Sequence, residues 1–271
     1  MTAEEIFRWA GEARRGNRAY VSNAYYTVGQ LKTFMEEKDV RVIADEDVIL
    51  LLERDDGLYR LQFFARSLEA LKTLPQLLPP LDQPLVTDFV GREPAVGSQA
   101  EQLCTMGFAP CSVFVRMVCK QHQMPRSDGT ERVETACSED AEAVHEMIAA
   151  AFDPLFAHIP SVEDLAQAIE KGEIRVIRAE GKLAAMAYFE KESEKYYVLR
   201  YFIVDPGFRG QNLAGALMYD RFSSAPEDTV YMLWVGTYNN AQSLYLKFGF
   251  QYDGLTDHIL LFGGKENGKN L

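Results

Sequence analysis

One short stretch of the sequence joins a strand, a turn that contains arginine and glycine, and the start of a helix. Residues 201–218 read YFIVDPGFRGQNLAGALM, in which Pro206 ends an apolar strand and a helix-like run begins at Leu213. The first turn of a helix presents unpaired backbone N–H groups and the positive end of the helix dipole. Gly210 lets the backbone approach a ligand closely, and Arg209 adds a positive charge. The stretch therefore predicts a phosphate or pyrophosphate site. The alternative is an ordinary strand-to-helix connection without a ligand, which can have the same sequence pattern.

A second stretch predicts a short helix followed by a strand. In residues 239–250, NNAQSLYLKFGF, apolar residues recur at the spacing of one helix face. These residues are Ala241, Leu244, Tyr245 and Phe248. Gly249 is expected to end the helix, and the chain then resumes as a strand.

Together the two stretches resemble the GNAT superfamily of N-acetyltransferases. The family signature is a strand ending in V-x-P, an R/Q-x-x-G-x-G/A turn into a helix, and a downstream helix ending in L-Y-x-x-x-G-F. Here the strand ends in VDP at residues 204–206, the turn is RGQNLA at residues 209–214, and LYLKFGF follows at residues 244–250. The resemblance covers about residues 131–263, and the first half of the chain only as a degenerate copy.

The resemblance implies acetyl-coenzyme A as cosubstrate. By resemblance, its pyrophosphate is held by the backbone N–H groups of Arg209, Gly210, Gln211, Asn212, Leu213 and Ala214, and its pantetheine arm pairs with the strand edge at Phe202, Ile203 and Val204. Asn212 stands where the family has glycine, so the turn is expected to be less open. Tyr238 occupies the expected asparagine position; Asn239 and Asn240 follow it, and of these Asn240 is assigned to the cofactor.

The resemblance also implies that Tyr245 is the catalytic proton donor. Acyl transfer to an amine needs a proton for the leaving thiolate, and a phenol with a pKa of about 10 is protonated at neutral pH. Tyr245 also belongs to the apolar face, so simple packing is an alternative. For the general base several candidates stay open, together with a chain of water molecules: Glu190, Glu192, Glu194, Tyr197, Tyr201 and His158. No cysteine falls within a motif, which favours direct transfer in a ternary complex.

The two halves of the chain repeat one another. LKTFMEEKDVRVIADEDVILLLE, from Leu31, is similar to LAQAIEKGEIRVIRAEGKLAAMAYFE, from Leu165, and two further matches follow in the same order. Ordered matches predict a duplicated domain, with a polar linker near residues 121–132. The first half has no counterpart of the Pro-x-x-Arg-Gly turn, and Leu103 stands where Tyr245 is expected. Residues 1–125 are therefore predicted to be a non-catalytic GNAT-like domain, and residues 131–265 the acetyltransferase domain.

Composition excludes several classes of function. The net charge is −12, and residues 131–271 hold 22 Asp and Glu against 13 Lys and Arg. This argues against a nucleic-acid partner and favours a cationic one, although solubility alone explains it equally well. The sequence has neither a membrane-spanning run nor a secretory signal, and its four cysteines show no metal-ligand spacing. We expect a cytoplasmic protein with buried thiols and no metal.

The sequence thus predicts an α/β (α+β) protein with tandem GNAT folds, each a mostly antiparallel sheet flanked by helices. The leading functional prediction is an N-acetyltransferase that moves an acetyl group to a primary amine of a small molecule or peptide. A non-catalytic acyl-coenzyme A sensor and an acyltransferase for longer acyl groups are the alternatives. A monomer, as an internal pseudo-dimer, and a homodimer both remain open.

Overall fold

The computed structural model describes residues 1–55, 57–120 and 129–263, and it divides into two compact units. Unit 1 comprises residues 1–114 and 255–271, and unit 2 comprises residues 115–254. The strand β6 (Phe108–Lys120) begins in unit 1 and ends in unit 2, whereas β12 (Gln251–Phe262) begins in unit 2 and ends in unit 1. The two units therefore do not coincide with the two halves of the sequence. Unit 1 includes the end of β12, from the second half, and unit 2 includes the end of β6, from the first half.

Unit 1 is built on the strand order β2-β3-β4-β5-β12-β6. Its strands are β1 (Val21–Ser22), β2 (Val40–Ala44), β3 (Val48–Asp55), β4 (Leu58–Ala65) and β5 (Leu85–Arg92), with parts of β6 and β12. Its helices are α1 (Ala3–Arg14), α2 (Val28–Glu37), α3 (Leu74–Leu77) and α4 (Ala95–Cys104), with the 3₁₀ turn η1 (Ala70–Thr73). Antiparallel pairs dominate, and β4 with β5 is a parallel pair.

Unit 2 is built on the order β6-β11-β10-β9-β8-β7. Its strands are β7 (Val133–Thr135), β8 (Ile174–Ala179), β9 (Lys182–Lys191), β10 (Tyr196–Val204) and β11 (Val230–Gly236). Its helices are α5 (Ala141–Ala151), α6 (Val162–Glu170), α7 (Leu213–Ser223) and α8 (Ala241–Lys247), with the 3₁₀ turns η3 (Thr130–Arg132), η4 (Ser138–Asp140) and η5 (Pro206–Phe208). Again antiparallel pairs dominate, and β10 with β11 is parallel.

The order of elements confirms the duplication predicted from the sequence. Two helices, a run of antiparallel strands, a connection, a parallel strand, a helix and a last strand follow one another in both halves. The connection differs between them. After β10 it contains α7, which has 11 residues, whereas after β4 it contains η1 and α3, of four residues each. The first half therefore has no long helix in the connection after β4, the position at which α7 follows β10 in the second half.

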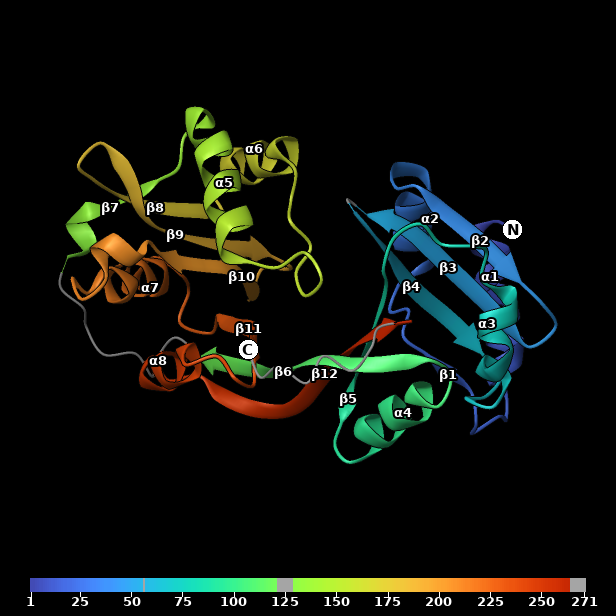
Figure 1. The fold of residues 1–271 in the computed structure, drawn as a ribbon. Helices are drawn as coiled ribbons and strands as arrows, with labels where there is room; N and C mark the ends of the chain where they lie inside the picture. The colour runs from blue at the N-terminus through green and yellow to red at the C-terminus, as the bar shows by residue number, and fades with distance from the viewer. Residues whose placement is uncertain (56, 121–128, 264–271) are drawn as a thin grey trace. The chain divides into compact units, whose positions relative to one another are not determined.

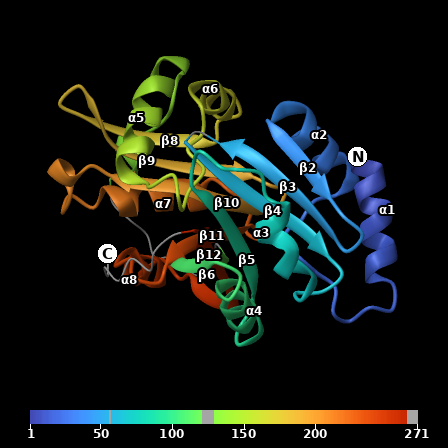
Figure 2. The ribbon, with the colours of Figure 1, turned by 45° about the vertical axis from the view of Figure 1, so that its right-hand side comes forward.

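Each unit buries apolar side chains on both faces of its sheet. In unit 1, α1 and α2 cover one face (Figure 2), through Ile6, Ala10 and Leu31. Leu71, Leu74 and Leu103 of η1, α3 and α4 pack in the cluster on the other face. In unit 2, α5 and α6 lie on one face of β8, β9 and β10, and α7 on the other (Figure 1). Removing such apolar surface from water is the main favourable term in folding.

The linker expected near residues 121–132 lies mostly outside the described residues, which resume at Gly129. All four cysteines are described and none forms a disulfide. Cys119 is buried, but Cys137 is exposed, so the expectation of four buried thiols is wrong. In the described part of the chain, no helix is both long enough and apolar enough to span a membrane.

A capping box stands at η4, directly before α5. It is formed by Cys137 and Asp140, whose carboxylate accepts the Cys137 backbone N–H at 2.8 Å. Arg178 on β8 donates to both oxygens of Asp140, at 2.9 and 2.7 Å. These hydrogen bonds hold the pKa of the buried Asp140 below its usual value, and the hydrogen bonds from Arg178 have the largest effect.

We predict that Asp140→Asn lowers the free energy of unfolding at pH 7 by about 1–3 kcal/mol, because a hydrogen-bonded charge is lost. The folded pKa of Asp140 lies below its unfolded pKa, so its contribution is complete above the unfolded pKa and disappears as pH falls through the folded one. Urea unfolding from pH 7 to pH 2 should therefore show the two proteins converging. The control is Glu134→Gln, which removes the exposed partner of the same arginine and should cost under about 1 kcal/mol. Equal effects of both variants would contradict this account.

Candidate active site

The turn predicted to bind an anion connects β10 to α7 in unit 2. β10 ends at Val204, one residue before Asp205, whose carboxylate accepts the Gly207 backbone N–H at 2.7 Å. Gly210 has φ of 82°, and a Cβ at this position would meet no atom within 4 Å. Helix α7 begins at Leu213, as predicted, and its first turn receives no side-chain cap from Asn212. The backbone N–H groups at the start of α7 are thus not capped by the residue that precedes them.

Asn212 adopts the left-handed conformation that this turn requires, with φ of 58° and ψ of 24°. Glycine reaches this region freely, and asparagine reaches it more easily than other residues with a side chain. The departure from the family pattern at this position therefore leaves the backbone in a glycine-like conformation. This is the physical reason why asparagine can replace glycine here.

We predict that Asn212→Gly leaves the free energy of unfolding within about 0.5 kcal/mol of the parent. Asn212→Val should lower it by about 1–3 kcal/mol, because a β-branched residue is strained at positive φ. Thermal or urea unfolding measures both variants. A valine variant as stable as the glycine variant would show that residue 212 does not hold this conformation.

Arg209 is an exposed cation at the same turn. Its Nε approaches the Val204 carbonyl oxygen at 3.5 Å, and within the described residues it makes no ion pair. Arg132 of η3 also lies here, because its Nη2 donates to the Gln211 carbonyl at 3.3 Å. Sequence reasoning missed Arg132, which belongs to the linker region and to no motif. Two guanidinium groups therefore stand beside the start of α7.

The edge of β10 that precedes the turn is open toward β11. The parallel register joins Tyr196 to Val230 and ends with Val198 at Met232, whereas β10 continues to Val204. Phe202, Ile203 and Val204 keep their antiparallel partners on β9. Among the described strands, none pairs with their other edge. The two parallel strands thus diverge beside the three residues assigned to the pantetheine arm.

The corresponding gap in unit 1 is filled by the chain itself. Strand β1 pairs with β4 there, and next to it Asn23 is buried with 3% of its surface exposed. The Asn23 side chain donates to the Leu61 carbonyl at 3.2 Å and to the Asp88 carbonyl at 2.9 Å, and it accepts the Phe63 backbone N–H at 2.7 Å. Asn23 therefore binds both diverging strands. Nothing in the sequence pattern pointed to this contact.

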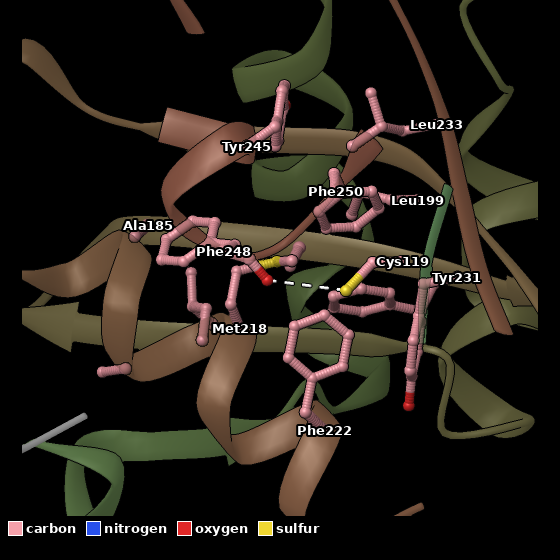
Figure 3. Packing of buried hydrophobic residues seen from close by; sticks show 14 of the residues in the cluster. Cys119, Ala185, Leu199, Met218, Phe222, Tyr231, Leu233, Tyr245, Phe248 and Phe250 are labelled. Atoms are coloured by element: carbon pink, nitrogen blue, oxygen red, sulfur yellow. Dashed lines mark hydrogen bonds between the residues drawn. The ribbon is translucent and has the colours of Figure 1, made fainter. Parts of the chain in front are cut away.

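Tyr245 projects from α8 into the buried cluster between α7, α8 and the sheet of unit 2. Its ring lies 6.1 Å from the Phe202 ring and 5.8 Å from the Phe250 ring, centre to centre. Figure 3 shows Tyr245 at the border of the apolar cluster, whose interior holds the Cys119–Phe248 hydrogen bond. Burial raises the pKa of Tyr245 to about 12. Within the described residues its hydroxyl makes no hydrogen bond, so the phenol is a protonated donor beside Phe202.

The asparagines before α8 have separate roles. The Asn239 side chain accepts the backbone N–H of Ala241, the first residue of α8, at 2.9 Å. Asn240 is exposed, and Tyr238 is 78% exposed. The Asn239 oxygen is therefore already engaged by the helix, whereas the Asn240 side chain is accessible to a ligand.

The carboxylates considered for a general base lie at the far end of β10. Glu190 and Glu192 pair with Arg200, and Glu194 pairs with Lys191. Glu190 stands opposite Val198, six positions before Val204 along β10. The Tyr201 hydroxyl donates to the His158 carbonyl. The structure therefore does not bring these carboxylates to the open strand edge.

A pocket of about 780 Å³ opens where β10 meets the turn. Its walls include Ile203, Val204 and Arg209, together with Met147 and Glu146 of α5. Asp140 and Arg178 form part of the wall as the ion pair described above. Neither Glu146 nor Lys182, the first residue of β9, makes an ion pair with any described residue. Among the described residues, the pocket therefore offers two carboxylates without an ion pair, Glu146 and Asp205, and two such cations, Lys182 and Arg209.

No group of three or more metal-ligating side chains occurs among the residues that the structure describes. Around the β10–α7 turn, Arg209, Arg132 and the first backbone N–H groups of α7 are donors that suit an anionic ligand, whereas the Asp205 carboxylate accepts the Gly207 N–H. Unit 2 therefore combines an uncapped helix start, an open strand edge and a neutral phenol.

Comparisons with known proteins agree with this arrangement. Residues 170–252 match the family model described as the acetyltransferase (GNAT) domain. Among solved structures, a tandem GNAT protein from the clavulanic acid biosynthesis pathway superposes with a TM-score of 0.62 at 13% identity, covering 98% of each chain. A GCN5-related N-acetyltransferase from Sphaerobacter thermophilus gives 0.57 at 14% identity, covering 99% of this chain and 95% of that one. One from Kribbella flavida gives 0.59 at 17% identity, covering 87% and 93%. No curated protein matches the sequence.

Residues 170–252 therefore match the GNAT acetyltransferase domain, and the fold of the chain is that of the tandem GNAT structure. The matched segment extends from the end of α6 to the start of β12 and so contains the turn, the open edge and Tyr245. The fold class predicted from the sequence is confirmed.

Proposed function

We propose that unit 2 transfers an acetyl group from acetyl-coenzyme A to an amine, by direct transfer in a ternary complex. The observation that carries the proposal is the open edge of β10 running into the uncapped start of α7. The pantetheine arm of the cosubstrate is an extended chain with two amides, which can pair with a strand edge. Its pyrophosphate is the anion that a helix start favours.

Four parts of the site would then have separate roles. Phe202, Ile203 and Val204 bind the pantetheine arm, and residues 209–214 bind the pyrophosphate, with Asn240 as a further contact. Tyr245 donates a proton to the departing thiolate, for which its protonated state at neutral pH is suited. The pocket next to Ile203 receives the amine, and Glu146 attracts its ammonium form. No described cysteine lines this pocket, which favours transfer without an acyl-enzyme.

We further propose that each chain has one cosubstrate site. Unit 1 lacks a long helix after β4, and Asn23 with β1 occupies the gap between β4 and β5. An extended ligand would have to break these hydrogen bonds in order to enter. Unit 1 is thus the non-catalytic domain of the pair.

The test is release of coenzyme A that depends on an added amine. The protein is incubated with acetyl-coenzyme A and a panel of mono-, di- and polyamines, amino acids and short peptides, and acetylated products are identified by mass spectrometry. We expect at least one amine to be acetylated at a rate well above the uncatalysed rate. Tight binding of acetyl-coenzyme A without product from any amine would instead favour the acyl-coenzyme A sensor.

A further inference from the structure

Unit 1 contains a pocket of its own beside the segment that fills its strand gap. The pocket has a volume of about 480 Å³ and lies between α1, residues 20–26 and the ends of β4 and β5. Its walls are mainly aromatic, from Phe7, Tyr20, Tyr25, Tyr26, Phe64 and Phe89. Pockets of 300–1,000 Å³ with apolar walls and a few polar groups are typical of small-molecule sites.

The charge among the lining residues has one sign, whereas the carboxylates of Asp88 and Asp257 act on Tyr25, and that of Glu53 on Tyr26, from outside the lining. Arg14 is the only charged side chain in its lining, and it makes no ion pair with any described residue. Burial raises the pKa of Tyr20, Tyr25 and Tyr26, so these phenols stay neutral. The Tyr26 hydroxyl accepts a hydrogen bond from Gln62 at 2.8 Å, which leaves its own hydrogen for another acceptor. The part of the pocket next to Arg14 therefore favours an anion over a cation.

A glycine within α1, Gly11, forms part of the pocket wall and adds no side chain to it. Gly11 lines the pocket, and a Cβ at this position would meet no atom within 4 Å. Its φ is not in the left-handed region, so the helix does not require glycine here. Glycine within a helix is destabilising relative to alanine. A larger side chain at residue 11 would therefore extend from the wall of the pocket.

We propose that this pocket binds a small carboxylate with an aromatic or branched aliphatic body, whose carboxylate pairs with Arg14 at the mouth. The body would lie against the aromatic walls, where it removes apolar surface from water. This site is independent of the proposed acetyl transfer, because all of its lining belongs to unit 1. It gives unit 1 a ligand-binding role that the loss of a cosubstrate site does not abolish.

The test uses the full chain with phenylacetate, and with phenylacetamide as the neutral analogue of nearly the same shape. Binding is measured by calorimetry or by ligand-observed NMR. We expect phenylacetate to bind about tenfold more tightly than phenylacetamide, and Arg14→Gln to remove that difference. The neighbouring Arg15→Gln is the matched control, since Arg15 does not line the pocket and should leave the difference unchanged.

A second pair of variants tests the location. Gly11→Leu places a side chain in the pocket without a clash at Cβ and should abolish binding of both compounds. Gly29→Leu, at an exposed helix position in α2 outside the pocket, should not. Absence of phenylacetate binding to the parent, binding that persists in Gly11→Leu, or equal affinity for the two compounds would each overturn the proposal.

Discussion

Replacing Tyr245 by phenylalanine is expected to lower the rate of acetyl transfer about 10²–10⁴-fold while leaving the affinity for acetyl-coenzyme A unchanged. The substitution removes only the hydroxyl, so the ring contacts with Phe202 and Phe250 remain. The thiolate that leaves coenzyme A then lacks its proton donor. Because burial raises the pKa of Tyr245 to about 12, the parent enzyme should lose no activity through ionisation of this group below about pH 11.

The matched control is Tyr252→Phe in the same unit, since the Tyr252 hydroxyl bonds to the Gln242 side chain at an exposed position. Its rate should stay within about twofold of the parent. Steady-state kinetics and calorimetry on the three proteins separate chemistry from binding. A parental rate in Tyr245→Phe would mean that Tyr245 only packs in the core.

Reversing the charge at Arg209 is expected to weaken acetyl-coenzyme A binding by about 100-fold. A hydrogen bond to a charged group contributes about 1.5–3 kcal/mol, and a glutamate adds repulsion from the phosphates. Arg209 is exposed and has no ionic partner among the described residues, so the folded structure should tolerate the change. The affinity of the parent should fall as ionic strength rises, because exposed charges are screened by salt.

Lys171→Glu is the control for charge reversal, because Lys171 is an exposed cation at the end of α6, away from the turn. It should change the affinity by less than about threefold. Arg132→Glu should have an intermediate effect, since Arg132 reaches the turn through Gln211. If Arg209→Glu binds as tightly as the parent, the cosubstrate does not use this turn.

Local sequence patterns were enough to predict the elements that carry the site. Pro206 cannot continue a strand ladder, and the apolar spacing after it begins a helix at Leu213, as the structure shows. The same holds for α8, which Gly249 follows before β12 begins. The ends of these strands and helices depend on a few neighbouring residues, so the local sequence is enough to predict them.

Long-range contacts were not predictable in this way. The partner of a strand is chosen by residues far away in the chain, so the division of β6 and β12 between the units gave no local signal. The same is true of Asn23, whose partners lie 38 to 65 positions away. The Cys137–Asp140 cap is a further example, because Arg178, which donates to Asp140, lies 38 positions away.

The number of acetyl-coenzyme A molecules bound by one chain tests the central claim most directly. Calorimetry on the full chain should give one site per chain, which Arg209→Glu weakens and Asn23→Ala leaves unchanged in number. Two sites per chain in the parent would contradict the assignment of unit 1 as a domain closed to the cosubstrate. No binding at all would contradict the assignment of the β10–α7 turn.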